Sequence, residues 1–348
     1  MQINCFEPSL SKQEEMAIGA CLDSKSLAFG PNVEAFENSF SSFSKKVYNV
    51  GMNSASSAAY AIFAFLKEKH GPCDVYTPSL GFTSPAWAAK ENGHNLIFVD
   101  VDDNLLFDSE DYKRKRKTNW LRKAVVMPVL YGGVSKIPNL ELHKDDIVVL
   151  DSAHCITPTM KYDYGLFSFH PVKPICMSNG GILATDDSEV NKWVRSYRNF
   201  GRLPIDDTYD IVQDGFNFYM NNLNAAIGLV QLRKCRFFIK LRAANNSRLM
   251  SEIKTGRFIE HDTYSSYYLS TLILDKGISS KKMRQYLKEN GVIASMHYPF
   301  LHKTKYYDSN RALNNLESYS DRIINLPIHQ NLRSADLDKI IELVNRGY

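Results

Sequence analysis

Residues 147–185 bring together, at short spacing, several side chains that can do chemistry. Asp151 follows the apolar run 147–150, and Ser168 and Lys173 are five positions apart in the segment SFHPVK. Pyridoxal 5′-phosphate (PLP) chemistry needs an amine that forms a Schiff base, an acid that keeps the pyridine nitrogen protonated, and donors for the phosphate. The spacing therefore favours a PLP site with Lys173 as the Schiff-base lysine.

Lys173 would have a second role in such a site. Once a substrate amine displaces it, it would act as a general base that moves a proton between the substrate carbon and C4′ of the cofactor. That role requires a lysine that is neutral near pH 7, which burial and a nearby cationic group can bring about.

A phosphate site is expected where residues 53–67 (NSASSAAYAIFAFLK) begin a helix. The backbone amides of Ser54 and Ala55 lie at this N-terminus, which favours a dianion. Ser168 can add its hydroxyl group. Phe82, in a turn after a strand, can stack on the ring of the cofactor.

Each of these side chains also has a plainer interpretation. A lysine without context is a surface charge, and Asp151 could cap the end of a strand. His154, three residues after Asp151, could be a structural histidine, and Phe82 could belong to the core. The combination of residues, and no single one, supports the prediction.

Expected strands and helices alternate up to about residue 235, and these elements position the residues named above. Strand-like runs at 75–77, 95–101, 124–130 and 147–150 are separated by expected helical stretches, which indicates a mainly parallel sheet covered on both faces. Ligands bind beyond the carboxyl ends of the strands in such a sheet. We therefore expect Asp151 and residues 78–82 to face the site.

The pattern changes after residue 235. It predicts, in order, a helix, a strand, a helix, a strand and a helix at 240–254, 270–274, 280–290, 292–297 and 334–346. We therefore expect a large domain over 1–235 and a small α+β domain over 236–348. The N-terminal segment is expected to pack near the small domain.

The charge balance and the cysteines exclude other classes of protein. The 348 residues carry 42 basic and 38 acidic side chains, so a polyanion track is not expected. The basic run 113–117 is the one candidate for a nucleic-acid patch, and it lies where a solvated helix should follow a strand. Six scattered cysteines without a CxxC pair argue against a metal site and fit reduced thiols. With no secretory signal and no apolar run of roughly 18 residues, we expect a soluble, cytoplasmic protein without a membrane span.

The whole chain resembles the sugar aminotransferases of the DegT/DnrJ/EryC1/StrS family, which have PLP fold type I and belong to the aspartate aminotransferase superfamily. SFHPVK and GFNFYMNNLNAAIGLVQL are the specific signals. The supporting pieces are FGPNVEAFENSFSSF, NSASSAAYAIFAFL, PSLGFTSPAWAA, IFVDVD, LDSAH, NGGILATDD, RNFGR, IASMHYPFLH and NLPIHQNL.

The resemblance implies a transfer of an amino group from an amino acid, with L-glutamate expected, to a keto-sugar. A nucleotide-linked keto-deoxysugar is the expected acceptor, in the biosynthesis of amino sugars, polysaccharides such as lipopolysaccharide, or secondary metabolites. It also implies a mainly parallel sheet flanked by helices in the large domain.

Roles for single residues follow from the resemblance. It implies that Asp151 pairs with the pyridinium, that His154 lies by the 3′ oxygen of the cofactor, and that the phosphate is held by Ser54, Ala55 and Ser168. Asn217 would reach the phosphate of a neighbouring subunit, which implies an obligate homodimer with shared active sites.

Two of these implied roles have competing interpretations. His297 would approach the sugar, but it could equally pack inside the small domain. Any of Asn221, Asn222 and Asn224 could merely cap the following helix, and each competes with Asn217 for the phosphate role.

Three departures from the family pattern affect the substrate more than the cofactor. The family has Gly-Glu-Gly-Gly after the lysine, and this chain has Ser-Asn-Gly-Gly, so the neutral amide of Asn179 replaces a glutamate near the substrate. Ala55 stands within Asn-Ser-Ala, where Ser-Gly-Thr is usual. The stretch between His154 and Ser168 is shorter than in the family.

Two rival functions share this fold. PLP-dependent sugar dehydratases of the same fold carry histidine at the position of Lys173, so lysine favours transamination. A PLP-fold regulator would be expected to carry a DNA-binding module, and none is evident. No function is predicted for His302 or His329, which are expected to be surface residues.

Overall fold

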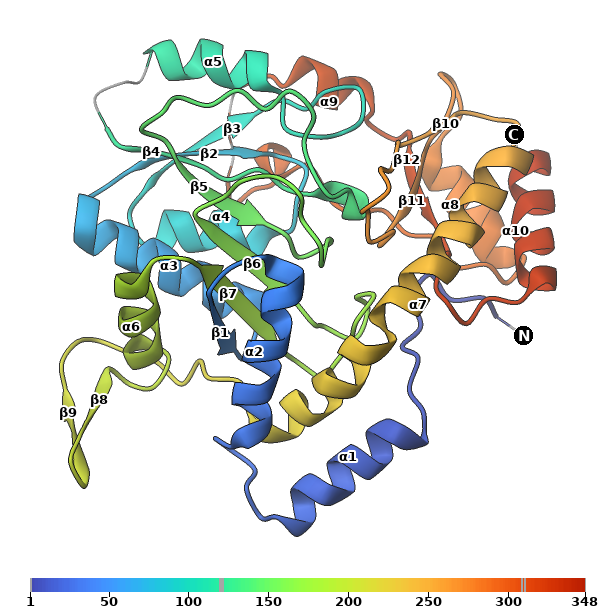
Figure 1. Ribbon diagram of the computed structural model, residues 1–348. Helices are drawn as coiled ribbons and strands as arrows, with labels where there is room; N and C mark the ends of the chain where they lie inside the picture. Colours follow the sequence, from blue (N-terminus) through green and yellow to red (C-terminus); the bar gives the residue numbers. More distant parts are fainter. Residues whose placement is uncertain (1, 119–121, 308, 310, 348) are drawn as a thin grey trace.

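The computed structural model describes residues 2–118, 122–307, 309 and 311–347, and it contains a large sheet and a smaller one (Figure 1). The large sheet has seven strands in the order β1-β7-β6-β5-β4-β2-β3. These strands are β1 (Tyr48–Met52), β2 (Asp74–Pro78), β3 (Asn95–Val99), β4 (Ala124–Val126), β5 (Ile147–Asp151), β6 (Tyr164–Ser168) and β7 (Gly181–Thr185).

The large sheet is mainly parallel. The pairs β3/β2, β2/β4, β4/β5 and β5/β6 are parallel, and β7 is antiparallel to both β6 and β1. The carboxyl ends of six strands, β1 to β6, therefore share one edge, where Asp151 ends β5 and Ser168 ends β6. The predicted α/β class, with a mainly parallel sheet flanked by helices, is confirmed.

Helices cover both faces of this sheet. Side chains along each strand point alternately to the two faces, so apolar side chains on both faces need a covering layer. Val149 packs in one core cluster with Ile62, and its neighbour Leu150 packs in another with Phe36. The helices of this part are α1 (Lys12–Asp23), α2 (Pro31–Ser44), α3 (Ala55–His70), α4 (Thr83–Glu91), α5 (Ser109–Thr118) and α6 (Ser188–Tyr197).

The small sheet, β10-β11-β12, is antiparallel and packs against two helices near both chain ends (Figure 1). Ile3 joins this core and forms backbone hydrogen bonds with Gly291 and Ile293. The elements are β10 (Arg257–Phe258), β11 (Ser270–Ile273), α8 (Ser280–Glu289), α9 (Asn314–Ser318), β12 (Ile323–Leu326) and α10 (Ser334–Arg346), with two 3-10 turns, η1 (Tyr131–Gly133) and η2 (Leu301–Lys303), elsewhere in the chain.

One long helix, α7 (Asn222–Glu252), runs from the large sheet to the small sheet (Figure 1). Residue 235, the predicted domain boundary, lies inside this continuous helix. The division into domains 1–235 and 236–348 stays a prediction. A separate hairpin, β8 (Arg202–Ile205) and β9 (Thr208–Ile211), projects away from the body of the molecule.

Two predicted elements are wrong. Residues 127–146 between β4 and β5 contain no α-helix, because Pro128, Gly132, Gly133 and Pro138 favour turns. Residues 292–297 form no strand and make only isolated bridges, Ile3 with Val292 and Ser295 with Asn325. The chain there turns from the small sheet toward the end of the large one.

The basic run 113–117 lies in α5, as predicted. Within the described residues, four of its five cations have an acidic partner; Lys113 pairs with Glu110 at 2.9 Å, and Lys115 pairs with Asp111 at 2.6 Å. These ion pairs make the run a charged helix surface that already has acidic partners.

His302 and His329 were wrongly expected at the surface, since both are buried. His302 bonds the Ser79 hydroxyl at 2.6 Å, and His329 bonds the Asn4 carbonyl at 3.1 Å. The six cysteines are free and buried, as predicted. Among the described residues, no helix combines the length and apolar character that crossing a bilayer requires.

Candidate active site

A cavity of about 380 Å³ opens at the carboxyl ends of β5 and β6 and collects nearly all the predicted site residues. It is lined by Ser54, Ala55, Phe82, Asp151, His154, Ser168, Lys173, Asn179 and His297. These residues come from five segments of the chain: 54–55, 82, 151–154, 168–179 and 297. The structure thus assembles them in one place, while the role of each stays a prediction.

Lys173 lies in the loop after β6, where its backbone N–H donates to the His170 carbonyl at 2.8 Å. Its side chain is buried, and its Nζ lies 4.1 Å from the centre of the Tyr268 ring. Burial lowers the pKa of this amine from 10.5 to about 7, although Asp151 opposes the shift. A large fraction of Lys173 is therefore neutral near pH 7, as a base or a nucleophile must be.

Asp151 ends β5 with its carboxylate buried in the same cavity. Its Oδ1 accepts the Ala153 backbone N–H at 3.0 Å. Burial raises the pKa of this carboxyl group, while that hydrogen bond and Lys173 lower it. A buried carboxylate without a full cationic partner is costly, so a protonated heterocycle next to it would be favoured.

We expect the cofactor-free protein to capture PLP at a rate that follows the neutral fraction of Lys173. Below pH 7 the rate should rise about tenfold per pH unit, and above about pH 7 it should level off, because only the free amine attacks a carbonyl. Stopped-flow absorbance would measure the rate, and a free lysine derivative would correct for the ionisation of PLP itself. A corrected rate that still rises toward the ordinary lysine pKa of 10.5 would contradict this expectation.

The N-terminus of α3 forms one wall of the cavity. Ser54 is the N-cap, and its hydroxyl accepts the Ser57 N–H at 3.1 Å. The first N–H groups of a helix have no partner within it, so Ala55 presents its amide at a site suited to an anion. Gly181 permits this arrangement, because a Cβ there would lie 2.3 Å from the Ser54 carbonyl carbon. Its strand pairs in register with Ser168, which brings the serine hydroxyl to the same wall.

His154 is buried between two tyrosines. Its Nε2 lies 2.9 Å from the Tyr298 hydroxyl, and its ring centre lies 4.3 Å from that of Tyr268. Burial, helped by the charge of Lys173, holds the pKa of His154 well below 6.5. Its Nδ1 is buried without a hydrogen-bond partner among the described residues.

Phe82 and His297 border the cavity from opposite parts of the chain. Phe82 is 52% exposed and 5.6 Å from the Tyr298 ring, which excludes the core interpretation. His297 bonds the Ser295 hydroxyl at 3.0 Å, and burial lowers its pKa to about 4. His297 is therefore a neutral hydrogen-bonding group at ordinary pH.

Asn179 is exposed at the rim, where its backbone carbonyl accepts a hydrogen bond from the Asn224 side chain at 2.6 Å. Asn221 is the N-cap of α7, and Asn222 is buried and bonds the Ser26 carbonyl at 2.6 Å. Asn221, Asn222 and Asn224, which compete with Asn217 for the phosphate role, thus each have a partner within the chain.

Asn217 does not line this cavity. It is exposed, and its backbone carbonyl accepts a hydrogen bond from the Asn53 side chain at 3.1 Å. Its side chain is therefore available to another molecule.

Two tyrosines of the cavity were missed in the sequence. Tyr268 precedes β11 in a segment with no recognisable motif. Tyr298 stands directly after His297, so the MHYPF segment could have indicated it.

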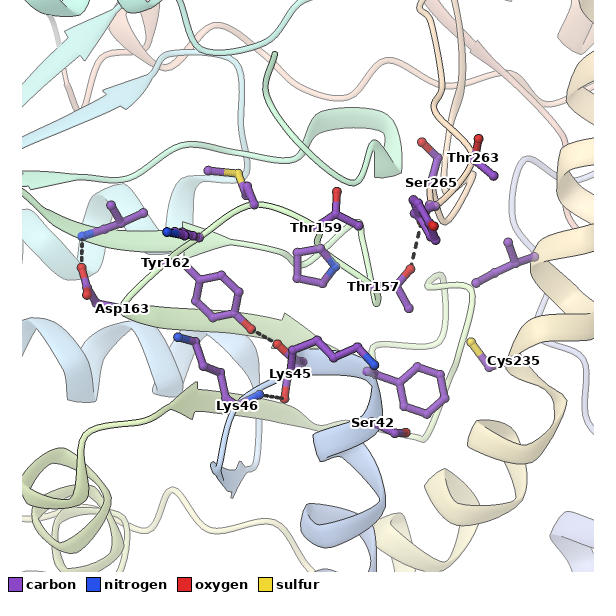
Figure 2. Close-up of a pocket in the computed structure, with 18 of the residues that line it drawn as sticks. Ser42, Lys45, Lys46, Thr157, Thr159, Tyr162, Asp163, Cys235, Thr263 and Ser265 are labelled. Atoms are coloured by element: carbon purple, nitrogen blue, oxygen red, sulfur yellow. Dashed lines mark hydrogen bonds between the residues drawn. The ribbon is translucent and has the colours of Figure 1, made fainter. Parts of the chain in front are cut away.

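A wider cavity of about 950 Å³ lies elsewhere, between α2, α7 and residues 157–163 (Figure 2). Its polar groups bond one another: Tyr162 donates to the Ser44 carbonyl, and Thr157 donates to that of Tyr264 at 2.9 Å. It contains none of the predicted site residues. Size alone therefore does not identify the reactive site.

The residues of the smaller cavity fit PLP. A buried amine can bond the aldehyde, a buried carboxylate can face the ring nitrogen, and a helix N-terminus with a serine hydroxyl can hold the phosphate. The buried Nδ1 of His154 adds a polar atom for which the described residues provide no hydrogen-bond partner. A bound ligand that forms a hydrogen bond with this nitrogen would explain why the described part of the chain leaves it without a partner.

Comparisons with known proteins agree with this chemistry. Residues 8–345 match the model of the DegT/DnrJ/EryC1/StrS aminotransferase family. The chain is 28% identical to the spore coat polysaccharide biosynthesis protein SpsC of Bacillus subtilis, over 97% of this chain and 95% of SpsC. It is 26% identical to the UDP-4-amino-4,6-dideoxy-N-acetyl-beta-L-altrosamine transaminase of Helicobacter pylori, over 98% and 96%.

The fold is similar to that of Helicobacter pylori PseC, an aminotransferase involved in the biosynthesis of pseudoaminic acid. The TM-score is 0.90 at 23% identity, and the match covers 100% of this chain and 99% of PseC. At this identity the likeness establishes the fold.

Proposed function

The chain belongs to the DegT/DnrJ/EryC1/StrS aminotransferase family, and from that premise we propose that it aminates the keto group of a nucleotide-linked sugar with L-glutamate as donor. It is a PLP-dependent sugar aminotransferase. The observation that carries the proposal is the burial of Lys173 and Asp151 in one cavity with a helix N-terminus at its wall. The Helicobacter pylori relative, whose named substrate is UDP-linked, supports the nucleotide-linked acceptor.

Bound PLP supplies an electron sink that lets an amino group leave one substrate and join another. Lys173, neutral near pH 7, moves the proton at the substrate carbon. Asp151 would hold the proton at the ring nitrogen, and Ser54, Ala55 and Ser168 would bind the phosphate. Phe82, which is half exposed at the cavity, would cover the ring.

The rim of the cavity supports a sugar as acceptor. Asn179 is exposed there, and His297 is neutral, so both can form hydrogen bonds to hydroxyl groups without adding charge. The polysaccharide role named for SpsC supports a place in amino-sugar or polysaccharide biosynthesis. Lipopolysaccharide is one polysaccharide that we propose as the destination of the amino sugar. The free, buried cysteines support a cytoplasmic location.

The function is tested by incubating the purified protein with L-glutamate and a panel of dTDP-, UDP- and GDP-linked keto-sugars. Mass spectrometry should find one amino-sugar and an equal amount of 2-oxoglutarate. A dehydrated sugar without an amino group would support the dehydratase instead. Amination only of an unlinked keto-sugar or cyclitol would overturn the nucleotide-linked acceptor.

We also propose a homodimer with shared active sites. Asn217 is exposed and outside its own cavity. The nearby hairpin β8–β9 exposes apolar side chains, with Leu203 47% and Ile211 66% exposed. An isolated hairpin is marginally stable in water, and exposed apolar groups of this kind favour burial against a second chain.

Hybrid dimers test this sharing. We expect Lys173→Ala and Asn217→Ala subunits to be poorly active alone, and their reassociated mixture to regain about a quarter of wild-type activity. Half of the dimers are then hybrids, and each has one intact site if Asn217 acts across the interface. Steady-state rates after mild dissociation and mixing provide the measurement.

A matched control mixes Lys173→Ala with Asp151→Asn subunits, whose changes both lie in the same subunit's cavity. That mixture should regain nothing, since neither site of its hybrid is intact. No recovery in the first mixture would place Asn217 in its own subunit, or outside the site.

A further inference from the structure

Tyr298 makes the one direct hydrogen bond that His154 has in the described part of the chain, with 2.9 Å between the hydroxyl and Nε2. Both groups are neutral at ordinary pH. Burial raises the pKa of Tyr298 well above 10 and lowers that of His154 well below 6.5. Tyr298 therefore carries one O–H proton, and His154 carries one N–H proton, which can be on Nδ1 or on Nε2.

The proton of this hydrogen bond is more stable on Tyr298 than on His154. An imidazole nitrogen is a stronger base than a phenol oxygen, so the O–H of Tyr298 donates to the lone pair of Nε2. The proton of the neutral imidazole must then reside on Nδ1. Tyr268, whose hydroxyl also lies near Tyr298, offers the weaker phenol oxygen as a competing acceptor.

The Nδ1 atom is buried, lacks a partner among the described residues, and belongs to a ring that lines the cavity. A buried N–H donor without an acceptor is costly. We propose that Tyr298 is a positioning residue that fixes His154 as the Nδ1–H tautomer, so that this N–H donates to an oxygen of bound PLP.

The opposite tautomer would be unfavourable with PLP bound. It would turn a lone pair of Nδ1 toward the negatively charged phenolic oxygen of the cofactor, and it would leave the Tyr298 proton to the weaker acceptor. Tyr298 comes from the segment after α8, while His154 follows β5. Tyr298 lies next to the small sheet, and His154 lies just beyond the end of a strand of the large sheet. Through this hydrogen bond, Tyr298 thus determines which nitrogen of His154 carries the proton.

The tautomer can be measured in the cofactor-free protein by ¹⁵N NMR of histidine-labelled samples, with His154 assigned among the nine histidines by its loss in His154→Gln. We expect a protonated Nδ1 and a bare Nε2. Tyr298→Phe should shift His154 toward a mixture of tautomers and weaken PLP binding about fivefold to tenfold, the loss expected for one hydrogen bond.

Tyr131→Phe is the matched control. The Tyr131 hydroxyl donates to the His297 carbonyl, so its loss loosens the same segment without touching the His154 bond. This control should leave the tautomer unchanged. A protonated Nε2 in the wild-type protein would overturn the proposal, as would an equal tautomer shift in Tyr131→Phe.

A double-mutant cycle on PLP affinity gives an independent outcome. A glutamine amide donates without depending on a tautomer, so Tyr298→Phe in the His154→Gln background should weaken PLP binding less than about twofold. An equal loss in both backgrounds would mean that Tyr298 acts by packing and not through His154.

Discussion

Lys173→Ala is expected to lower the rate of amino transfer by at least about 10⁴-fold, because it removes both the amine that holds PLP and the base that moves the substrate proton. PLP should still bind through the phosphate contacts of Ser54, Ala55 and Ser168, but more weakly. Single-turnover kinetics with L-glutamate would measure the loss, and the absorption spectrum would report the altered attachment.

Lys173→Arg is the informative companion, since it keeps a cation in the cavity but does not supply a neutral amine. It should be as inactive as Lys173→Ala. Circular dichroism would show whether either variant is folded. A folded Lys173→Ala protein with near wild-type turnover would remove the basis of the proposed chemistry.

Asp151→Asn is expected to lower kcat by about 10²- to 10³-fold, or ~3–4 kcal/mol, the cost of leaving one member of a buried charge pair without its partner. The carboxylate is what stabilises a proton on the ring nitrogen, and an amide cannot do so. The absorption spectrum of the bound cofactor should report the change together with the rate.

Asp163→Asn provides a control near the opposite end of the same pair of strands. Asp163 precedes β6 and accepts the Val148 N–H at 2.8 Å, a hydrogen bond that an asparagine oxygen can keep. Its rate should stay within about twofold of wild type. A similar loss in both variants would mean that the effect comes from the sheet and not from the ring nitrogen.

Local sequence signals were sufficient for much of the fold. The α3 helix begins at Ala55 after the Ser54 cap, as the run of small hydroxyl residues predicted, because a serine side chain can satisfy an N–H of the first turn. Asp151 and Ser168 lie at neighbouring strand ends, since parallel strands bring their carboxyl ends to one edge.

Long-range packing decided what local signals could not. The segment 292–297 has strand-like residues but is drawn toward the cavity, where His297 and Tyr298 contact residues of the large sheet. Tyr268 packs against Lys173 across about a hundred residues of sequence. His302 is buried because Ser79 and Glu317 happen to satisfy both of its nitrogens.

The most direct test of the central claim, that Lys173 holds PLP in a glutamate-dependent sugar aminotransferase, is the absorption spectrum of the purified protein during two additions. L-Glutamate should bleach the visible band of bound PLP and release one 2-oxoglutarate per site. A nucleotide-linked keto-sugar should then restore the band while one amino-sugar forms. A protein that binds no PLP, or whose visible band is unchanged by every amino donor, would contradict the account.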